Sequence, residues 1–227
     1  MLNINILGIC GSPRKGNTFL MVKKALEAAQ KVQGVSTDFI HIKSKLSPCL
    51  DCNKCPVNPP EKFCTISDQM DEIYPKLIEA DGIIIGSPVY FGTVNAQTKA
   101  FMDRCRPLGR AGSLLRFKVG GACAVAGLRH GGQEKTISAI IDYFLMAGMC
   151  PIGLGNPPEV GACGVAFNSG KVVDDIWYRE SIKVNIGGLD EASQLGRTVA
   201  LMSKIIKIGL KEVNIAKELI PFKLYSE

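Results

Sequence analysis

The stretch INILGICGSPRKGNTFLMVKK, Ile4 to Lys24, decides the fold. Its first residues, Ile4 to Ile9, are mostly apolar and long enough for a buried strand, and the glycine- and proline-containing segment 8–13 ends that strand. From Asn17 onward apolar side chains recur at helical spacing, namely Phe19, Val22, Leu26 and Ala29. The stretch therefore predicts a strand, a loop and a helix.

The loop in this unit has the residue types of a phosphate site. Backbone N–H groups at the start of a helix, together with the positive end of the helix dipole, favour an anion. The side chains predicted to hold a phosphate are Ser12, Arg14, Asn17 and Thr18. The segment GSPRKGNT is neither a Walker A motif nor a dinucleotide fingerprint, which points to a monophosphate such as FMN. A tight turn with an ordinary helix N-cap is the alternative.

Composition places the chain among globular proteins. It has 227 residues, of which 46% are hydrophobic and 21% charged, and this predicts one domain with an extension. A net charge of +6 without a long basic block is too weak a bias for nucleic-acid binding, but it suits an acidic partner or an anionic cofactor. We find no apolar run of membrane-spanning length and no charged leader before the first strand, so we expect a cytoplasmic protein without a membrane partner.

Strand and helix patterns alternate along the first 155 residues. Strands are predicted at 35–42, 81–87, 117–126 and 149–154, and helices at 18–32, 67–80, 95–104 and 133–147. This alternation predicts a flavodoxin-like, doubly wound parallel sheet of five strands in the order 2-1-3-4-5. His41, at the end of the second strand, is expected to face solvent.

Two further loops follow strands of this sheet. Ligands of open α/β sheets lie outside the carboxyl ends of the strands, so the loops at 86–92 and 127–134 should face the same crevice as the phosphate loop. Tyr90 and Phe91 can cover an aromatic ring, although either one alone also suits the rim of a core. Gly131 and Gly132 let a backbone approach a planar ring closely.

Four of the nine cysteines crowd into residues 49–64, after the second strand. In a reducing compartment such clustering indicates a metal site before disulfides. Cys49, Cys52 and Cys55 stand at three-residue steps, as in the C-x2-C-x2-C spacing of bacterial ferredoxins, and Cys64 can close the set beyond a proline-rich turn. Structural zinc prefers two separated pairs, so an iron-sulfur cluster is favoured over zinc, a redox disulfide or a reactive thiol. The other five cysteines are expected to be small buried hydrophobes.

The chain beyond residue 155 leaves the repeat. We predict a functional or interface insertion at 155–188, with Trp177, Tyr178 and Arg179 as anchors. A final helix is predicted at 189–208, followed by an apolar tail with Ile215, Leu219, Ile220 and Phe222. Such a tail is too apolar to leave exposed, which predicts a homo-oligomer. The predicted division is a flavin-binding domain at 1–155 and, at 156–227, an extension packed on it and in the oligomer interface.

Three loops and the cysteine motif resemble the iron-sulfur flavoprotein branch of the NADPH-dependent FMN reductase superfamily. The loops are 11–18, 86–92 and 131–134, in the same order as the FMN-contacting loops of that superfamily. Cys49, Cys52, Cys55 and Cys64 match the cysteine motif of the branch, although the eight residues between the last two make a wider gap than the branch commonly shows. The resemblance covers about residues 1–155.

The resemblance implies one FMN and one 4Fe-4S cluster per subunit, in dimers or tetramers where the cluster of one subunit lies near the flavin of another. The four cysteines would ligate iron. The isoalloxazine ring would be held by Pro88, Val89, Tyr90, Phe91, Gly92, Gly131 and Gly132. No side chain is predicted to act as an acid or a base.

The main functional hypothesis is electron transfer from a one-electron donor such as ferredoxin, through the cluster, to FMN and on to a small-molecule or protein acceptor. The alternative is an NAD(P)H-dependent reductase of FMN or quinone in which the cysteine loop is a zinc site or a redox switch. A third hypothesis is a non-catalytic module that binds FMN weakly or holds another phosphate.

Overall fold

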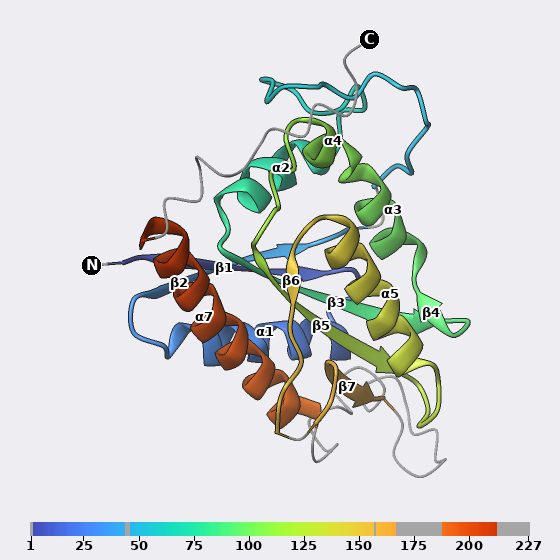
Figure 1. Ribbon diagram of the computed structural model, residues 1–227. Helices are drawn as coiled ribbons and strands as arrows, with labels where there is room; N and C mark the ends of the chain where they lie inside the picture. Colours follow the sequence, from blue (N-terminus) through green and yellow to red (C-terminus); the bar gives the residue numbers. More distant parts are fainter. Residues whose placement is uncertain (1, 44–45, 157, 167–187, 213–227) are drawn as a thin grey trace.

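The computed structural model describes residues 2–43, 46–156, 158–166 and 188–212. Its centre is a parallel sheet with helices on both faces (Figure 1). The strand order is β2 (Val35–His41), β1 (Ile4–Cys10), β3 (Gly82–Tyr90), β5 (Val119–Ala126) and β6 (Cys150–Pro151). This order confirms the predicted 2-1-3-4-5 arrangement. Two short strands lie off this path: β4 (Thr93–Val94) pairs antiparallel with β3, and β7 (Ala162–Val165) pairs with β5.

The helices divide between the two faces of the sheet (Figure 1). One face is covered by α1 (Asn17–Gln30) and α7 (Gly188–Glu212), and the other by α2 (Met70–Glu79), α3 (Ala96–Arg104) and α5 (Gln133–Met146). A short helix that the sequence did not predict, α4 (Arg106–Arg110), follows α3 directly. Strand β1 feeds both cores, because successive side chains of a strand point to opposite faces: Ile4 and Ile6 pack with α1 and α7, and Leu7 and Ile9 pack on the opposite face.

Glycines in β5 let the helices approach the sheet closely. A Cβ atom at Gly120 would lie 2.6 Å from the Phe144 ring of α5, and one at Gly121 would lie 2.7 Å from Val199 of α7. Every residue of β5 is buried. The centre of the sheet is therefore packed tightly from both sides, which fixes the positions of the loops at its carboxyl edge.

The fifth position of the sheet differs from the prediction of one strand at 149–154. Two short pieces share it: Cys150–Pro151 lie beside Val119–Gly120, and β7 lies beside Cys123–Ala126. Ile152 still donates to the Gly120 carbonyl oxygen at 2.9 Å, and the chain then leaves the sheet and turns at Gly155, where φ is 80°.

The sheet thus takes in four residues from beyond the predicted boundary at residue 155. The division into domains stays a prediction. The predicted anchors Trp177, Tyr178 and Arg179 and the apolar tail from Ile215 to Phe222 lie outside the described residues. None of the described helices combines the length and apolar character needed to cross a membrane.

The contact between α1 and α7 depends on Gly196. A Cβ atom there would lie 1.9 Å from the carbonyl oxygen of Ala25 in α1, and side-chain rotation cannot relieve a clash with backbone. Gly209, in the same helix, has nothing within 4 Å of its Cβ position. Gly196 and Gly209 are therefore a matched pair, one required for packing and one not.

We predict that Gly196→Ala lowers the free energy of unfolding by about 1–3 kcal/mol or more, because the added methyl group forces α7 away from α1. Gly209→Ala, the control, is expected to raise stability by about 0.5–1 kcal/mol, since alanine costs less conformational entropy in a helix. Urea unfolding followed by circular dichroism measures both. Equal stability of Gly196→Ala and the wild type would contradict this close helix contact.

Candidate functional site

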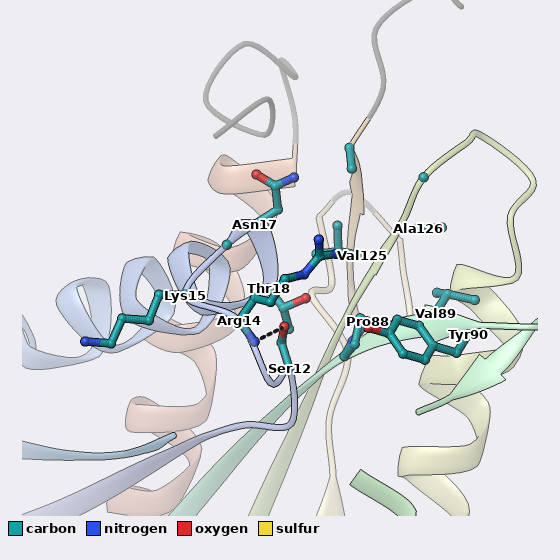
Figure 2. Close-up of a pocket in the computed structure, with 13 residues that line it drawn as sticks. Ser12, Arg14, Lys15, Asn17, Thr18, Pro88, Val89, Tyr90, Val125 and Ala126 are labelled. Atoms are coloured by element: carbon teal, nitrogen blue, oxygen red, sulfur yellow. Dashed lines mark hydrogen bonds between the residues drawn. The ribbon is translucent and has the colours of Figure 1, made fainter. Parts of the chain in front are cut away.

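The loop between β1 and α1 carries the geometry of an anion site. Helix α1 begins at Asn17 with no side chain capping its first amides and no acidic residue in its first turn. Ser12, Asn17 and Thr18 are buried, and Ser12 Oγ accepts a hydrogen bond from the Arg14 amide at 3.3 Å (Figure 2). Uncapped amides at the positive end of a helix, beside serine, threonine and arginine, suit a bound phosphate.

His41 contacts the backbone of this loop, so the expectation that it faces solvent is wrong. The ring is half-buried, its Nε2 atom lies 2.7 Å from the Ser12 carbonyl oxygen, and it packs edge-on against Phe19 at 5.4 Å. The parallel register between β1 and β2 sets Cys10 opposite His41, which places the imidazole next to the start of the loop. Sequence alone gave no signal for this pairing.

A cavity of about 360 Å³ opens beside the loop, at the carboxyl edge of the sheet (Figure 2). Seven of the residues predicted from the sequence line it: Ser12, Arg14, Asn17, Thr18, Pro88, Val89 and Tyr90. Six others also line it: Lys15 and Gly16 belong to the same predicted loop, and the remaining four are Val125, Ala126, Gly127 and Ala166. The residues at the end of β5 could have been found from the sequence, which predicts a loop at the carboxyl edge there. Ala166 could not, because it follows β7, and the sequence did not predict that two short strands share the fifth position of the sheet.

Phe91, Gly92, Gly131 and Gly132 do not border this cavity. Their loops touch each other instead: a Cβ atom at Gly132, where φ is 107°, would lie 2.7 Å from the Cα atom of Gly92. Phe91 is fully exposed, directly after the cavity-lining Tyr90. Gly92 and Gly132 thus form a contact between the two loops, and the role of all four residues toward a flavin stays a prediction.

A buried polar network joins the first two loops. Asn95 Nδ2 donates to the Gly11 carbonyl oxygen at 2.8 Å, and the Asn95 Oδ1 atom accepts from Thr98 Oγ1 at 2.6 Å. Ser87, at the end of β3, donates to Pro88 O at 2.9 Å and lies 3.2 Å from Thr98 Oγ1. A Cβ atom at Gly11 would lie 1.8 Å from Thr98 Oγ1, so only glycine fits there. The network holds the phosphate loop and the start of α3 in one arrangement.

The four clustered cysteines surround one small space. A cavity of about 20 Å³ is bordered by Cys49, Cys52, Cys55 and Cys64, together with Leu50, Asn53, Ile66, Asp103, Arg104, Arg106 and Pro107. The loop takes left-handed backbone conformations at Asp51 and Asn53, with φ of 46° and 55°. Arg106 fixes this turn by donating to Asp51 Oδ1 at 2.7 Å and to Asn53 Oδ1 at 3.3 Å.

The surroundings of the loop shift the pKa values of two of these thiols in opposite directions. Hydrogen bonds from the Lys54 amide and the Thr65 hydroxyl lower the pKa of Cys52. Burial raises the pKa of Cys55; Arg106 opposes this, and the charges of the other three cysteines add to it. Within the described residues, no three His, Cys, Asp or Glu side chains are arranged to hold a single metal ion.

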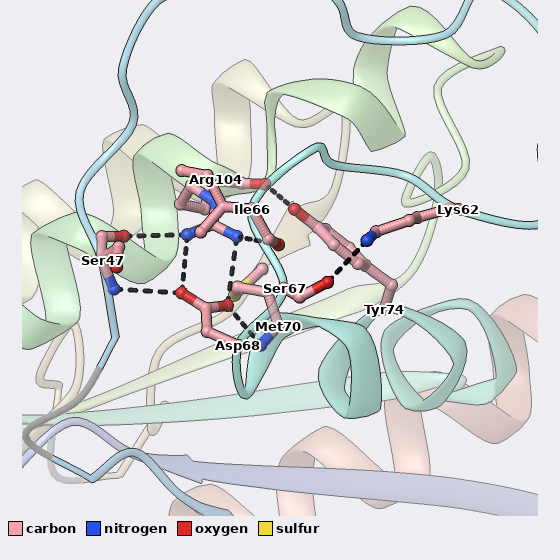
Figure 3. Close-up of polar contacts among 8 residues, drawn as sticks. All are labelled: Ser47, Lys62, Ile66, Ser67, Asp68, Met70, Tyr74 and Arg104. Carbon is pink, nitrogen blue, oxygen red and sulfur yellow. Dashed lines mark hydrogen bonds and ion pairs between the residues drawn. The ribbon is translucent and has the colours of Figure 1, made fainter.

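A buried ion pair closes the base of the cysteine loop (Figure 3). Arg104 is 1% exposed and donates to both oxygens of Asp68, at 2.9 and 3.1 Å. It also donates to the carbonyl oxygens of Ser47 at 2.9 Å and of Ile66 at 3.3 Å, which flank the cysteine segment on either side. Asp68 accepts from the amides of Ser47 and Met70 as well. Burial alone would raise the pKa of Asp68, but these hydrogen bonds outweigh it and lower the pKa.

Helix α3 links the two sites. Its N-cap, Asn95, holds the phosphate loop, and its last residue, Arg104, holds the cysteine loop. A helix of nine residues spans about 14 Å at 1.5 Å per residue. The loops that border the two cavities are therefore attached to opposite ends of one short helix.

Comparison with known proteins agrees with this arrangement. The chain matches the NADPH-dependent FMN reductase family over residues 4–156. It is 47% identical to an iron-sulfur flavoprotein of Methanocaldococcus jannaschii, over 90% of this chain and 100% of that protein. It is 46% identical to an iron-sulfur flavoprotein of Methanosarcina thermophila, over 66% and 78% of the two chains. The flavodoxin-type, WrbA-like protein of Agrobacterium tumefaciens has the same fold, with a TM-score of 0.62 at 18% identity over 89% and 99% of the two chains.

We predict that Asp68→Asn lowers the free energy of unfolding by about 3 kcal/mol at neutral pH, because it breaks a buried ion pair. The lowered pKa of Asp68 means that this stability is present above the ordinary carboxyl value of 3.8 and is lost as pH falls through the folded-state pKa. The difference in the free energy of unfolding between Asp68→Asn and the wild type should therefore become smaller at acidic pH. Urea unfolding at a series of pH values measures it.

The matched control is Asp103→Asn, next to Arg104 in sequence. Asp103 pairs with Lys99, four residues earlier, on the exposed face of α3, so its loss should cost less than about 1 kcal/mol. An Asp68→Asn protein that is no less stable than Asp103→Asn would contradict the structural role of the buried pair.

Proposed function

The chain belongs to the NADPH-dependent FMN reductase family and, within it, to the iron-sulfur flavoproteins, and from this premise we propose how its two sites work together. It is a flavin-dependent oxidoreductase. In the proposed function it takes electrons from a one-electron donor such as ferredoxin through a 4Fe-4S cluster, and passes them to FMN and on to an acceptor. The observation that carries this proposal is the pairing of an anion-binding cavity with a four-cysteine cavity at the two ends of α3.

The first cavity fits FMN. Its volume of about 360 Å³ lies within the range of cofactor pockets. The uncapped start of α1, with Ser12, Arg14, Asn17 and Thr18, would hold the phosphate. The backbone and side chains of 88–90 and 125–127 form a wall where a planar ring can lie, and we assign Phe91, Gly92, Gly131 and Gly132 to the loops around its edge.

The second cavity fits an iron-sulfur cluster better than a zinc ion. A tetrahedral zinc site needs four sulfur atoms about 2.3 Å from one ion, and the described cysteines are not arranged that closely. A cluster holds its cysteines farther apart, because iron and sulfide atoms lie between them. Cys49, Cys52, Cys55 and Cys64 border one space and are the proposed ligands. The first two are exposed and can adjust to the cluster.

The bound cofactors would supply the electron chemistry, one electron at a time at the cluster and one or two at FMN. The chain itself binds, orients and screens them. His41 and Asn95 hold the phosphate loop through backbone oxygens, and Arg104 and Arg106 hold the cysteine loop. Among the described residues we assign no acid or base.

We propose that the protein works as a homodimer or homotetramer. Exposed apolar side chains stand beside both cavities: Tyr90, Phe91 and Leu128 near the first, and Leu50 and Val57 in the cysteine loop. Exposed apolar side chains of this size are typical of an interface. An interface between these two regions would bring the cluster of one subunit near the flavin of its partner.

A second candidate is an NAD(P)H-dependent reductase of FMN or quinone, which the name of the matching family favours. In that case the cysteine loop would be a zinc site or a redox switch. The two functions differ in the electron donor, so the rate of flavin reduction by each donor separates them.

We predict that protein purified without oxygen contains FMN, iron and sulfide, and that reduced ferredoxin bleaches its flavin absorption. Cys52→Ser should keep FMN but lose the cluster, so that flavin reduction by ferredoxin slows at least tenfold. Cys150→Ser, a cysteine at the edge of the sheet, is the control and should behave as the wild type. Stopped-flow absorption with metal and sulfide analysis measures these changes. Rapid bleaching by NADPH and none by ferredoxin would instead support the second candidate.

We predict that Arg14→Ala weakens FMN binding about tenfold or more, because a hydrogen bond to a charged group is worth about 1.5–3 kcal/mol. Titration of flavin-free protein with FMN, followed by quenching of flavin fluorescence, measures the dissociation constant. Lys24→Ala removes a cation from the half-exposed face of α1 and is the control. Equal affinity in Arg14→Ala and Lys24→Ala would remove Arg14 from the proposed phosphate site.

A further inference from the structure

The buried arginine at the end of α3 has one hydrogen-bond donor left over. A guanidinium group carries five N–H donors. Four of them are directed at Asp68 and at the carbonyl oxygens of Ser47 and Ile66. The fifth, on Nε of Arg104, is buried and has no acceptor in the described part of the chain. Buried N–H groups without an acceptor are rare in folded proteins, so this one needs an explanation.

The place of Arg104 in the fold indicates what the missing acceptor is. Its side chain is 1% exposed, yet it borders the cavity that is also lined by the four clustered cysteines. The guanidinium holds Ser47, two residues before the first of these cysteines, and Ile66, two residues after the last. It therefore lies at the base of the loop. Two side chains with oxygen acceptors also line this cavity, but both are already bound: Asp103 pairs with Lys99, and Asn53 Oδ1 accepts from Arg106. The other side-chain acceptors that line it are the sulfur atoms of the four cysteines.

We propose that Nε of Arg104 donates a hydrogen bond to a sulfur atom of the bound iron-sulfur cluster, and that this bond raises the reduction potential of the cluster. The inference rests on the proposed function, since it requires a cluster in the cysteine cavity. The sulfur is that of a ligating cysteine or an inorganic sulfide. Both kinds of sulfur atom are electron-rich, and reduction of the cluster increases their electron density further.

The direction of the effect follows from charge. Reduction adds one electron to an anionic cluster, so a hydrogen bond from a cationic donor stabilises the reduced form more than the oxidised form. Asp68 balances the charge of Arg104 on the opposite edge of the guanidinium. The Nε–H bond is therefore the main means by which Arg104 affects the cluster, and its loss should make reduction less favourable.

Arg106 provides a matched control in the same cavity. It also borders the four cysteines, but its side chain is 41% exposed and its guanidinium is bound to Asp51 and Asn53. Arg104→Lys and Arg106→Lys both keep the positive charge. Only the first removes a buried Nε–H donor.

The first experiment is a redox titration of each holoprotein, followed by the electron paramagnetic resonance signal of the reduced cluster, after iron and sulfide contents are shown to be equal. In Arg104→Lys the equilibrium constant for reduction should fall at least threefold, or about 28 mV at 59 mV per tenfold for one electron. Arg106→Lys should shift it less than this. A fully loaded Arg104→Lys protein with the wild-type potential would overturn the proposal.

The second experiment does not depend on the Arg104 variant folding. Arg106→Lys protein is labelled with ¹⁵N at arginine Nε only, and its reduced cluster is studied by pulsed electron paramagnetic resonance. A ¹⁵N coupling to the cluster is expected, and a reduced cluster without one would overturn the proposal. Wild-type protein without iron and sulfide would refute the proposed function together with this inference, whereas a full cluster with neither effect would refute the inference alone.

Discussion

Buried hydrogen bonds at the two ends of α3 are the constraint on which both sites depend. At its start Asn95 binds the carbonyl oxygen of Gly11, and at its end Arg104 binds those of Ser47 and Ile66. Each bond ties a loop to a helix that is itself packed on the sheet through the fully buried Phe101. Polar groups this deeply buried are costly to leave unpaired, so the loops are held in single arrangements. The distance between the two sites is then set by the length of one helix.

The phosphate loop and the cysteine loop are stabilised in different ways. The first follows a strand in which six of seven residues are buried and precedes a packed helix, so its amides are positioned by the core. The second is largely exposed and has little apolar packing of its own, apart from Phe63, whose ring lies 5.2 Å from that of Tyr74. The conformation of this loop is held by the ion pair of Arg104 and Asp68 at its base and by the hydrogen bonds of Arg106 to its turn. A bound cluster would add four further bonds to the same loop.

The sequence was informative about the fold and the candidate site where a feature depends on residues that are close together in the chain. Alternating apolar runs and helical spacing gave the strands, the helices and their order, because periodicity reflects which face is buried. The residues proposed to hold a phosphate could be picked out because a loop between a strand and a helix uses few residue types for an anion. Gly127 and Ala166 line the same cavity but were not named as site residues. Gly127 lies in a loop that the sequence had already indicated, whereas Ala166 follows β7, which the sequence did not predict.

By itself, then, the sequence determined the parallel sheet, the order of its strands and the four cysteines of one loop, since all of these follow from periodicity and spacing along the chain. Only the tertiary structure decided that His41 supports the phosphate loop, that the fifth strand is split, and that Arg104 closes the cysteine loop. These depend on contacts between residues far apart in sequence: 29 positions separate His41 from Ser12, and 57 separate Arg104 from Ser47. A side chain's partners at that separation are set by strand register and helix packing, which local pattern does not encode.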